Sequence, residues 1–438
     1  MAGVFQVGID RLRTIVLNKL PALSYSDYRR LFYYSFFTAA SRWALMLARG
    51  WLVFELTDSS LAVGVVTFAG MSQLIIVGPI AGAVADRLDR RQLALAAVLI
   101  MMLSSSVLAA LTLANWVQVW HVVVLAVVHG VAMAIAQPSI QALIPNLVSQ
   151  QHLLNAVSLS GIAQHGSRLA GPLIGGILLV TFGAGICFVF ATLILIFALL
   201  QLLSIEYRTT EAVDIERPKI TVVGIGREIA AGISHICQDA RLYSIIGCVG
   251  FHCAFTMAYE ALLPRIATNL GGDSNTYSTI VVGVGAGAVV GVLFISTIKN
   301  SVLQGRVFTF TGLVSGLAML VLATTNNTSI AVLAAVFVGG SQAGYMAISN
   351  ALVQKVVPDS FRGRVMSIFA MIAGGLMAFM NLGFGWFADM LGADVLMFVP
   401  GLAWVVIFLI AALILPEFQS VLRRGVFRDQ PATIQSGD

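Results

Sequence analysis

Residues 82–91 read Gly82-Ala83-Val84-Ala85-Asp86-Arg87-Leu88-Asp89-Arg90-Arg91. This run places five charged side chains in its last six positions, between the apolar segments 61–85 and 92–113. Each of these two segments is long enough to cross a bilayer as a helix, which takes about 20 residues. The charged run therefore predicts a tight turn at one face of a membrane, with Gly82 where two helices approach closely.

The composition of the 438-residue chain excludes a soluble globular protein. Hydrophobic residues make up 58% of the chain and charged residues only 10%, whereas a soluble domain has about 25% charged residues. We therefore expect an all-α polytopic membrane protein with twelve transmembrane helices. The apolar segments that predict these helices are 31–56, 61–85, 92–113, 120–145, 155–182, 184–205, 242–264, 275–298, 305–324, 329–354, 364–387 and 394–415.

The distribution of Lys and Arg predicts the topology. Of the 25 basic residues, 21 fall in seven segments that we place on one side of the membrane. By the positive-inside rule these segments are cytoplasmic, which puts both termini in the cytoplasm of a multi-pass cell-membrane protein. The net charge of +5 is then a topology signal, and the expected surroundings are membrane lipids and not nucleic acid. The seven segments are 1–30, 86–92, 146–154, 206–241, 299–306, 355–364 and 416–438.

The predicted domain organisation follows from these segments. The linker contains an amphipathic stretch from Val222 to Cys237, which we expect to lie on the inner membrane surface. The five parts are a cytoplasmic N-terminal segment 1–30, a six-helix half 31–205, a cytoplasmic linker 206–241, a second six-helix half 242–415 and a cytoplasmic tail 416–438.

An internal repeat relates the two halves. Residues 141–159 align with residues 350–368 at an offset of 209, and the same offset places Gly82 on Gly291. Two separate regions that share one offset without gaps indicate duplication. Parallel repeats of this kind are related by a pseudo-symmetry axis along the membrane normal.

Motifs over nearly the whole chain resemble those of the major facilitator superfamily, in particular its drug and siderophore exporter branch of enterobactin-exporter-like proteins. The motifs are Trp51–Thr57, Asp86–Arg91, Ala142–Val148, Asn155–Val157, Arg168–Gly176 and Val357–Ser367. The resemblance implies the major facilitator fold and transport by rocker-switch alternating access. Asp89 stands where the loop of this superfamily usually has glycine.

The resemblance implies a cytoplasmic gate in the charged loop, made by Gly82, Asp86, Arg87, Arg90 and Arg91. Their charges would pair with one another or cap a neighbouring helix end. The alternative is that the basic residues only keep the loop inside the cell.

The fifth predicted helix carries Arg168, Gly171, Pro172, Gly175 and Gly176, which resemble a motif that exporters of the superfamily carry. Glycines at i and i+4 let helices pack closely, and proline bends the helix. The alternative is an ordinary packing seam, with Arg168 in a structural role.

The candidate substrate-binding residues come from the expected centre of the membrane, where a charge is costly and therefore points to function. This region holds arginines and histidines but no carboxylate. In the superfamily, helices 1, 4, 7 and 10 line the central cavity. A cationic cavity favours an anionic or acidic amphiphile as substrate. The candidates are Arg42, Arg49, His129, His252, Gln342 and Tyr345.

Proton coupling needs a group that gains and loses a proton between the two membrane faces. Histidine titrates near neutral pH, which makes His129, His165 and His252 candidates. Glu55 and Glu260 are carboxylate candidates near the external ends of their helices. The sequence does not choose among the five.

The leading functional hypothesis is a secondary active exporter of a small organic molecule, siderophore-, drug- or acidic amphiphile-like, that works by proton antiport. The alternative is an importer or a lysophospholipid flippase on the same fold. The sequence contains no Walker phosphate loop and no HExxH or GxSxG motif, so we expect no enzyme activity and no cofactor. Its four cysteines match no metal-ligand spacing, and a monomer suffices for this fold.

Overall fold

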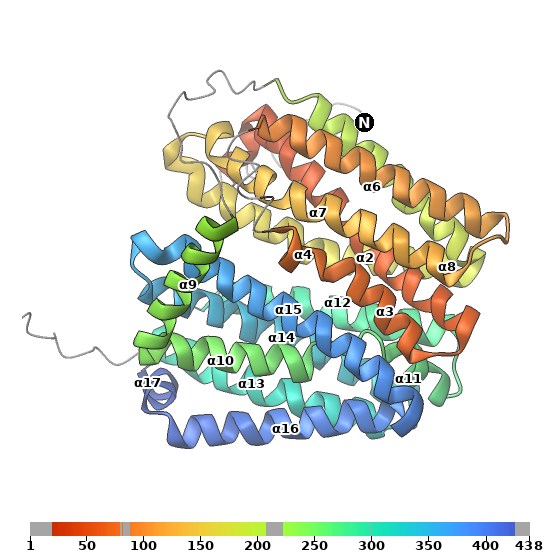
Figure 1. Cartoon of the computed structure of the whole chain (residues 1–438). Coiled ribbons are helices and arrows are strands. Elements are labelled where there is room, and N and C mark those ends of the chain that lie inside the picture. The colour runs from red at the N-terminus through yellow and green to blue at the C-terminus, as the bar shows by residue number, and fades with distance from the viewer. Residues whose placement is uncertain (1–19, 79–80, 82–87, 207–221, 299, 425–438) are drawn as a thin grey trace, which may run out of the picture. The chain divides into compact units, whose positions relative to one another are not determined.

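The computed structural model describes residues 20–78, 81, 88–206, 222–298 and 300–424. Within these ranges the ordered elements are all helices, so the all-α prediction is confirmed. The chain divides into two compact units (Figure 1). Unit 1 comprises Met1–Asp58 and Val65–Lys219, and unit 2 comprises Ser59–Gly64 and Ile220–Asp438. The expected limits of the two halves, 31–205 and 242–415, stay predictions.

Unit 1 is built from long apolar helices in which α2 packs against α8, and α6 packs against both α7 and α8. The first residues of α3 group with unit 2, and the rest of α3 belongs to unit 1. The elements are η1 (Pro21–Ser24), α2 (Ser26–Thr57), α3 (Ser60–Met71), α4 (Gln73–Ile76), α6 (Arg90–Leu113), α7 (Val119–Leu147), η2 (Gln150–His152) and α8 (Leu153–Leu203).

A sharp bend divides α8 at Gly183. This glycine has φ 79° and ψ 176°, a non-helical conformation within a run of helical residues. Residues with a Cβ rarely adopt such a positive φ. The bend therefore separates the two helices expected over 155–182 and 184–205, and no loop is needed between them.

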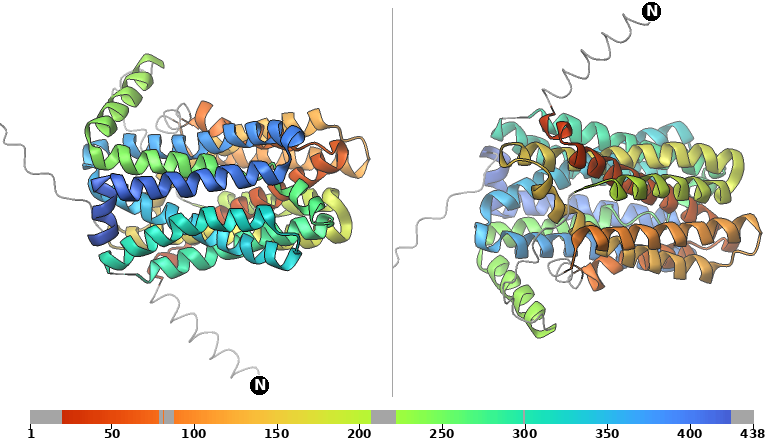
Figure 2. Two further views of the ribbon diagram at one scale, coloured as in Figure 1. Left: turned by 90° about the horizontal axis from the view of Figure 1, so that it is seen from below. Right: turned by 90° about the horizontal axis from the view of Figure 1, so that it is seen from above.

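Unit 2 continues the helical bundle, and α16 lies beside α10 and α13 in both Figure 1 and Figure 2. In addition, α12 packs against α14, and α10 packs against α15. The elements are α9 (Val222–Gln238), α10 (Ala240–Thr256), α11 (Leu263–Asn269), α12 (Ser274–Ser296), α13 (Ser301–Thr324), α14 (Thr328–Val356), α15 (Asp359–Leu391), α16 (Ala393–Ile414) and α17 (Pro416–Arg424).

Two elements of unit 2 differ from expectation. The segment 242–264, expected as one helix, is interrupted after Thr256, and α11 begins seven residues later, at Leu263, with Pro264 in its first turn. The expected tail contains α17, whose Phe418 and Val421 are buried in the core of unit 2. A helix with one apolar face is stabilised by such burial even when it is short.

The amphipathic stretch of the linker forms α9, which leaves the bundle of unit 2 at an angle (Figure 2). It packs on the start of α15, where the His235 ring stacks on Phe361 with centroids 4.3 Å apart. A Cβ on Gly232 would lie 2.5 Å from the side chain of Ile368, so glycine permits this close approach. Placement of α9 on the inner membrane surface stays a prediction.

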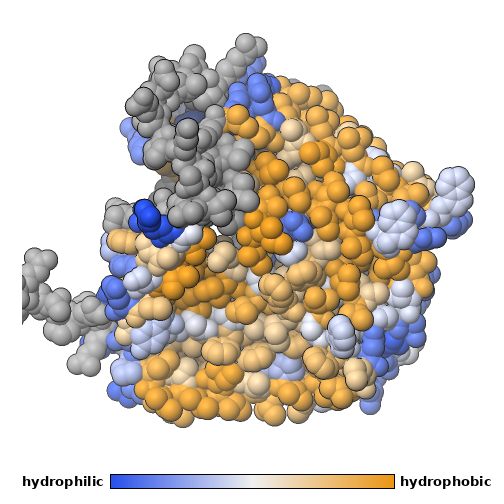
Figure 3. Space-filling view, in the orientation of Figure 1, coloured by the Kyte–Doolittle hydropathy of each residue, from blue (hydrophilic) through white to orange (hydrophobic). Residues whose placement is uncertain are grey.

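The described helices have the length and surface of membrane spans. Eight of them are long and apolar enough to cross a bilayer, and one of these is the double helix α8. Together they account for nine of the twelve expected segments; 31–56, 61–85 and 242–264 are not among them. Apolar side chains cover most of the face in Figure 3, with hydrophilic ones toward its edges. An apolar surface this extensive indicates contact with lipid.

Candidate functional site

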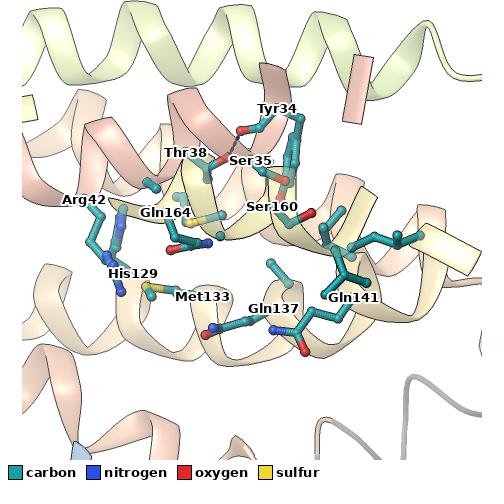
Figure 4. A pocket seen from close by; sticks show the side chains of 17 residues that line it. Tyr34, Ser35, Thr38, Arg42, His129, Met133, Gln137, Gln141, Ser160 and Gln164 are labelled. Carbon is teal, nitrogen blue, oxygen red and sulfur yellow. Dashed lines mark hydrogen bonds between the residues drawn. The ribbon is translucent and has the colours of Figure 1, made fainter. Parts of the chain in front are cut away.

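A cavity of about 410 Å³ opens inside unit 1 between α2, α6, α7 and α8 (Figure 4). Among the described residues that line it, Arg42 is the one Arg or Lys, His129 is the one histidine, and there is no carboxylate. The lining residues are Tyr34, Ser35, Thr38, Ala39, Arg42, Met101, His129, Met133, Ala136, Gln137, Ile140, Gln141, Ile144, Val157, Ser160, Gly161 and Gln164.

Arg42 is the dominant electrostatic feature of the cavity. Its Nε atom is buried without a hydrogen-bond partner, and its guanidinium carbon lies 4.9 Å from the centroid of the Trp43 ring. No carboxylate among the described residues forms an ion pair with it. Because a partly buried guanidinium without a counter-charge loses hydration, a bound anion would stabilise it.

His129 of α7 lies at the same end of the cavity as Arg42 (Figure 4). The imidazole is buried, and its Nδ1 lies 3.4 Å from the Ser104 hydroxyl of α6. This contact orients the imidazole ring, which lies near the Arg42 guanidinium. The pair can therefore offer an anionic group one permanent charge and one imidazole nitrogen.

The glycines of α8 bring this helix against α2 beside Arg42. A Cβ on Gly171 would lie 2.5 Å from the Ala40 carbonyl oxygen and 2.9 Å from the Trp43 Cβ. A Cβ on Gly175 would lie 3.1 Å from the Cβ of Ala44. The close packing carries Arg168 to the Trp43 ring, 4.9 Å from its centroid. In this helix the buried Pro172 and Gly176 complete the predicted motif.

Arg49 does not line the cavity, although it lies two turns after Arg42 on the same helix. Its side chain is only 7% exposed, and its Nε and Nη2 atoms have no hydrogen-bond partner. Among the predicted substrate-binding residues, the structure thus brings Arg42 and His129 into the cavity and keeps Arg49 out of its lining.

The remaining predicted substrate-binding residues are packed inside unit 2. His252 Nε2 lies 3.1 Å from the Ser315 hydroxyl, and the His252 ring lies 4.4 Å from that of Tyr345. Gln342 accepts a 3.3 Å hydrogen bond from the Tyr259 hydroxyl. All three predicted residues are fully buried and belong to the interior of this unit.

Several cavity residues were not predicted from the sequence. Gln137 and Gln141 are one turn apart on α7, and Ser160 and Gln164 are one turn apart on α8. Polar residues at i and i+4 share a helix face. Two such pairs in apolar helices were a sequence signal for a polar cavity.

Glu260 is the one predicted proton-coupling carboxylate that the structure buries. It lies between α10 and α11, is 9% exposed, and accepts a 2.6 Å hydrogen bond from Asn381 Nδ2 of α15. Glu55 is exposed near the end of α2. His165 belongs to α8, and its side chain lies outside the described residues.

In the charged loop, the described residues bind the ends of neighbouring helices. Arg90 Nη1 donates a 2.9 Å hydrogen bond to the Ala142 carbonyl of α7, and Arg91 Nη2 donates one of 2.8 Å to the Leu203 carbonyl of α8. Asp89 is the N-cap of α6, where it accepts from two backbone N–H groups. The other predicted gate residues, Gly82, Asp86 and Arg87, lie outside the described residues.

The sequence model of the transmembrane secretion effector family matches residues 18–431, nearly the whole chain. The chain belongs to this family of major facilitator transporters. This chain is 20% identical over 342 residues to the staphyloferrin A transporter of Staphylococcus aureus. The match covers 78% of this chain and 84% of that relative. The chain is 21% identical over 344 residues to macrolide efflux protein A of Streptococcus pyogenes, with coverage of 78% and 84%.

Solved structures show the same fold. A peptide transporter of the POT family superimposes on this chain with a TM-score of 0.71 at 13% identity. The superposition covers 89% of this chain and 94% of the peptide transporter. A nucleoside transporter superimposes with a TM-score of 0.66 at 12% identity, covering 88% and 99%. The resemblance to the major facilitator superfamily and its efflux branch is therefore confirmed.

Proposed function

We propose that this transporter exports a small organic anion that binds in the cavity of unit 1. The observation that carries the proposal is Arg42. Among the described residues, its cavity is lined by no Asp, Glu or Lys, and no carboxylate forms an ion pair with it. In surroundings of low dielectric constant a fixed positive charge attracts an anion more strongly than it does in water. A carboxylate or phosphate group would provide the acceptors that the guanidinium lacks.

The other lining residues favour an amphiphilic molecule over a small inorganic ion. Gln137, Gln141 and Gln164 offer neutral donors and acceptors, and Met101 and Met133 offer adaptable apolar contacts. A cavity of about 410 Å³ also has the size typical of small-molecule sites. Relatives named as a staphyloferrin A transporter and as a macrolide efflux protein support the transport of an organic molecule.

For energy coupling we propose proton antiport with alternating access between the two membrane faces. Glu260 is the leading proton carrier because it is buried and its carboxylate has an amide donor within 2.6 Å. His129 and His252 are the buried alternatives. The arginines of the charged loop, which bind carbonyls of α7 and α8, would act at the cytoplasmic gate.

The test is proton flux in proteoliposomes that hold an internal pH dye under an imposed pH gradient. Acidic amphiphiles, catecholate siderophores and lipophilic cations are added in turn to the wild type, Arg42→Ala and the exposed control Arg306→Ala. We expect proton movement with the anionic compounds, its loss in Arg42→Ala and its retention in the control.

Proton movement with cations alone, or normal flux in a folded Arg42→Ala variant, would contradict the anion site. Absence of proton movement with every compound would contradict proton antiport. It would favour lipid movement, which fluorescent lysophospholipids in the same vesicles would then reveal.

A further inference from the structure

Three sulfur atoms converge in unit 2 where α10 ends. Cys253 Sγ lies 3.8 Å from Met257 Sδ and 3.8 Å from Met346 Sδ. Cys253 and Met257 are one turn apart on α10 and its C-cap, and Met346 comes from α14, which packs against α10. We call these three residues the sulfur triad.

A hydrogen bond from the thiol accounts for only one of the two sulfur contacts of Cys253. A thiol has one proton, so it donates to one acceptor at a time, yet two thioethers lie at equal distances from Cys253. Metal–sulfur bonds are about 2.3 Å long, and three sulfurs around one ion in a trigonal plane would therefore stand about 4 Å apart. The two separations that involve the Cys253 sulfur, to Met257 and to Met346, are both 3.8 Å and close to this value.

We propose that the sulfur triad binds one soft monovalent ion, Cu(I), with Ag(I) as its chemical equivalent. Thiolate and thioether ligands select Cu(I), whereas carboxylate and carbonyl ligands select hard cations. The Cys253 thiol releases its proton as the metal–sulfur bond forms. One thiolate and one monovalent ion leave the site neutral, which suits an apolar interior in which an unpaired charge would be costly.

Within the triad the thiol is more deeply buried than the two thioethers. Cys253 is 1% exposed, whereas Met257 and Met346 are half-buried and belong to the margin of the core of unit 2. Met257 is also the residue at which helical hydrogen bonding of α10 ends. The described residues contain no group of three His, Cys, Asp or Glu that could hold a metal. A borderline divalent ion such as Zn²⁺ therefore has no competing site of that kind among them.

The test measures Cu(I) affinity of the purified full chain in nanodiscs, by competition with bicinchoninate under anaerobic reducing conditions. All variants carry Cys237→Ser, because Cys237 is the exposed cysteine and would bind copper on its own. We expect one Cu(I) per chain and its loss in Cys253→Ser. Met257→Leu and Met346→Leu should each weaken binding roughly tenfold or more, since even outer-shell changes weaken metal sites ~10–100-fold.

Cys248→Ser, which removes another buried thiol of α10, is the matched control and should keep full affinity. X-ray absorption of the Cu(I)-loaded protein should show sulfur neighbours only, and Zn²⁺ should not displace Cu(I). Unchanged affinity in both Met→Leu variants, which keep side-chain volume and so preserve folding, would overturn the proposal even if Cys253→Ser fails to fold. Nitrogen or oxygen neighbours in the absorption spectrum would overturn it as well.

Discussion

Asn381 donates a 2.6 Å hydrogen bond from its Nδ2 to the carboxylate of Glu260. The Oδ1 of the same Asn381 accepts a 3.0 Å hydrogen bond from the backbone N–H of Ala261. Both contacts anchor the non-helical connection between α10 and α11 to α15, and Asn381 itself is fully buried. A side-chain amide thus supports both a buried carboxylate and the interrupted backbone beside it.

Replacement of Glu260 by Gln should abolish substrate-driven proton flux while substrate binding persists. The amide keeps the shape of the carboxylate but cannot exchange a proton at physiological pH. Proton flux in proteoliposomes and substrate binding to detergent-solubilised protein measure the two effects separately. Asp394→Asn, which changes an exposed carboxylate that is not a proton-coupling candidate, is the control. Retained flux in Glu260→Gln would rule out Glu260 as the proton carrier.

Gly171→Ala should destabilise the transporter by about 1–3 kcal/mol through overpacking of α8 against α2. The new methyl group would meet the Ala40 carbonyl oxygen, a backbone atom that cannot rotate away. Gly166→Ala on the same helix is the matched control, because its nearest neighbour would be Phe36 at 3.7 Å. Thermal unfolding in detergent measures both variants. Equal unfolding temperatures would show that the glycine seam is not tightly packed.

Labelling of Cys237 tests the predicted topology. Of the four cysteines, Cys237 is exposed and the other three are buried. Because α9 belongs to the predicted cytoplasmic linker, a membrane-impermeant maleimide should label inverted vesicles and leave intact cells unlabelled. Ala114→Cys in a Cys237→Ser background, which places a thiol in a predicted external connection, should show the opposite pattern. Labelling of Cys237 in intact cells would reverse the orientation.

Acid should weaken the junction between α9 and α10 through Asp239. Burial favours a higher pKa for this carboxyl, but hydrogen bonds and the charge of Arg241 outweigh it and hold the pKa below its ordinary value. The N-cap carboxylate accepts 2.9 Å and 2.6 Å hydrogen bonds from Arg241 Nε and Nη2. Because the pKa of Asp239 is lower in the folded state, its ionised form stabilises the fold at pH values above the ordinary pKa of Asp, about 3.9. This stabilisation is lost as the pH falls from that value through the lowered pKa of the folded state.

The measurement for Asp239 is the unfolding temperature between pH 7 and pH 3. Asp239→Asn keeps an N-cap residue but removes the charge, so it should lower the unfolding temperature at pH 7 and reduce its change with pH. A variant with the wild-type pH dependence would assign the acid response to other carboxyl groups.

Membrane class, helix positions and family were readable from the sequence, because the bilayer imposes apolar segments of fixed length and basic residues stay on one side. The central positions of Arg42 and His129 in their helices could also be predicted from the sequence, because the depth of a residue in the membrane follows from its distance along the helix. The interruption after Thr256 had a weaker local signal in Pro264, because helices often end shortly before a proline.

Tertiary structure decided which of these residues share a site. Arg42 and Arg49 have nearly the same helical direction by spacing, yet only Arg42 lines the cavity, because the two lie about 10 Å apart along the helix axis. The sulfur triad joins Cys253 to Met346, 93 residues later in the chain. Local periodicity relates residues within one helix, whereas contacts of this kind depend on how α10 and α14 pack, and only the folded chain determines that.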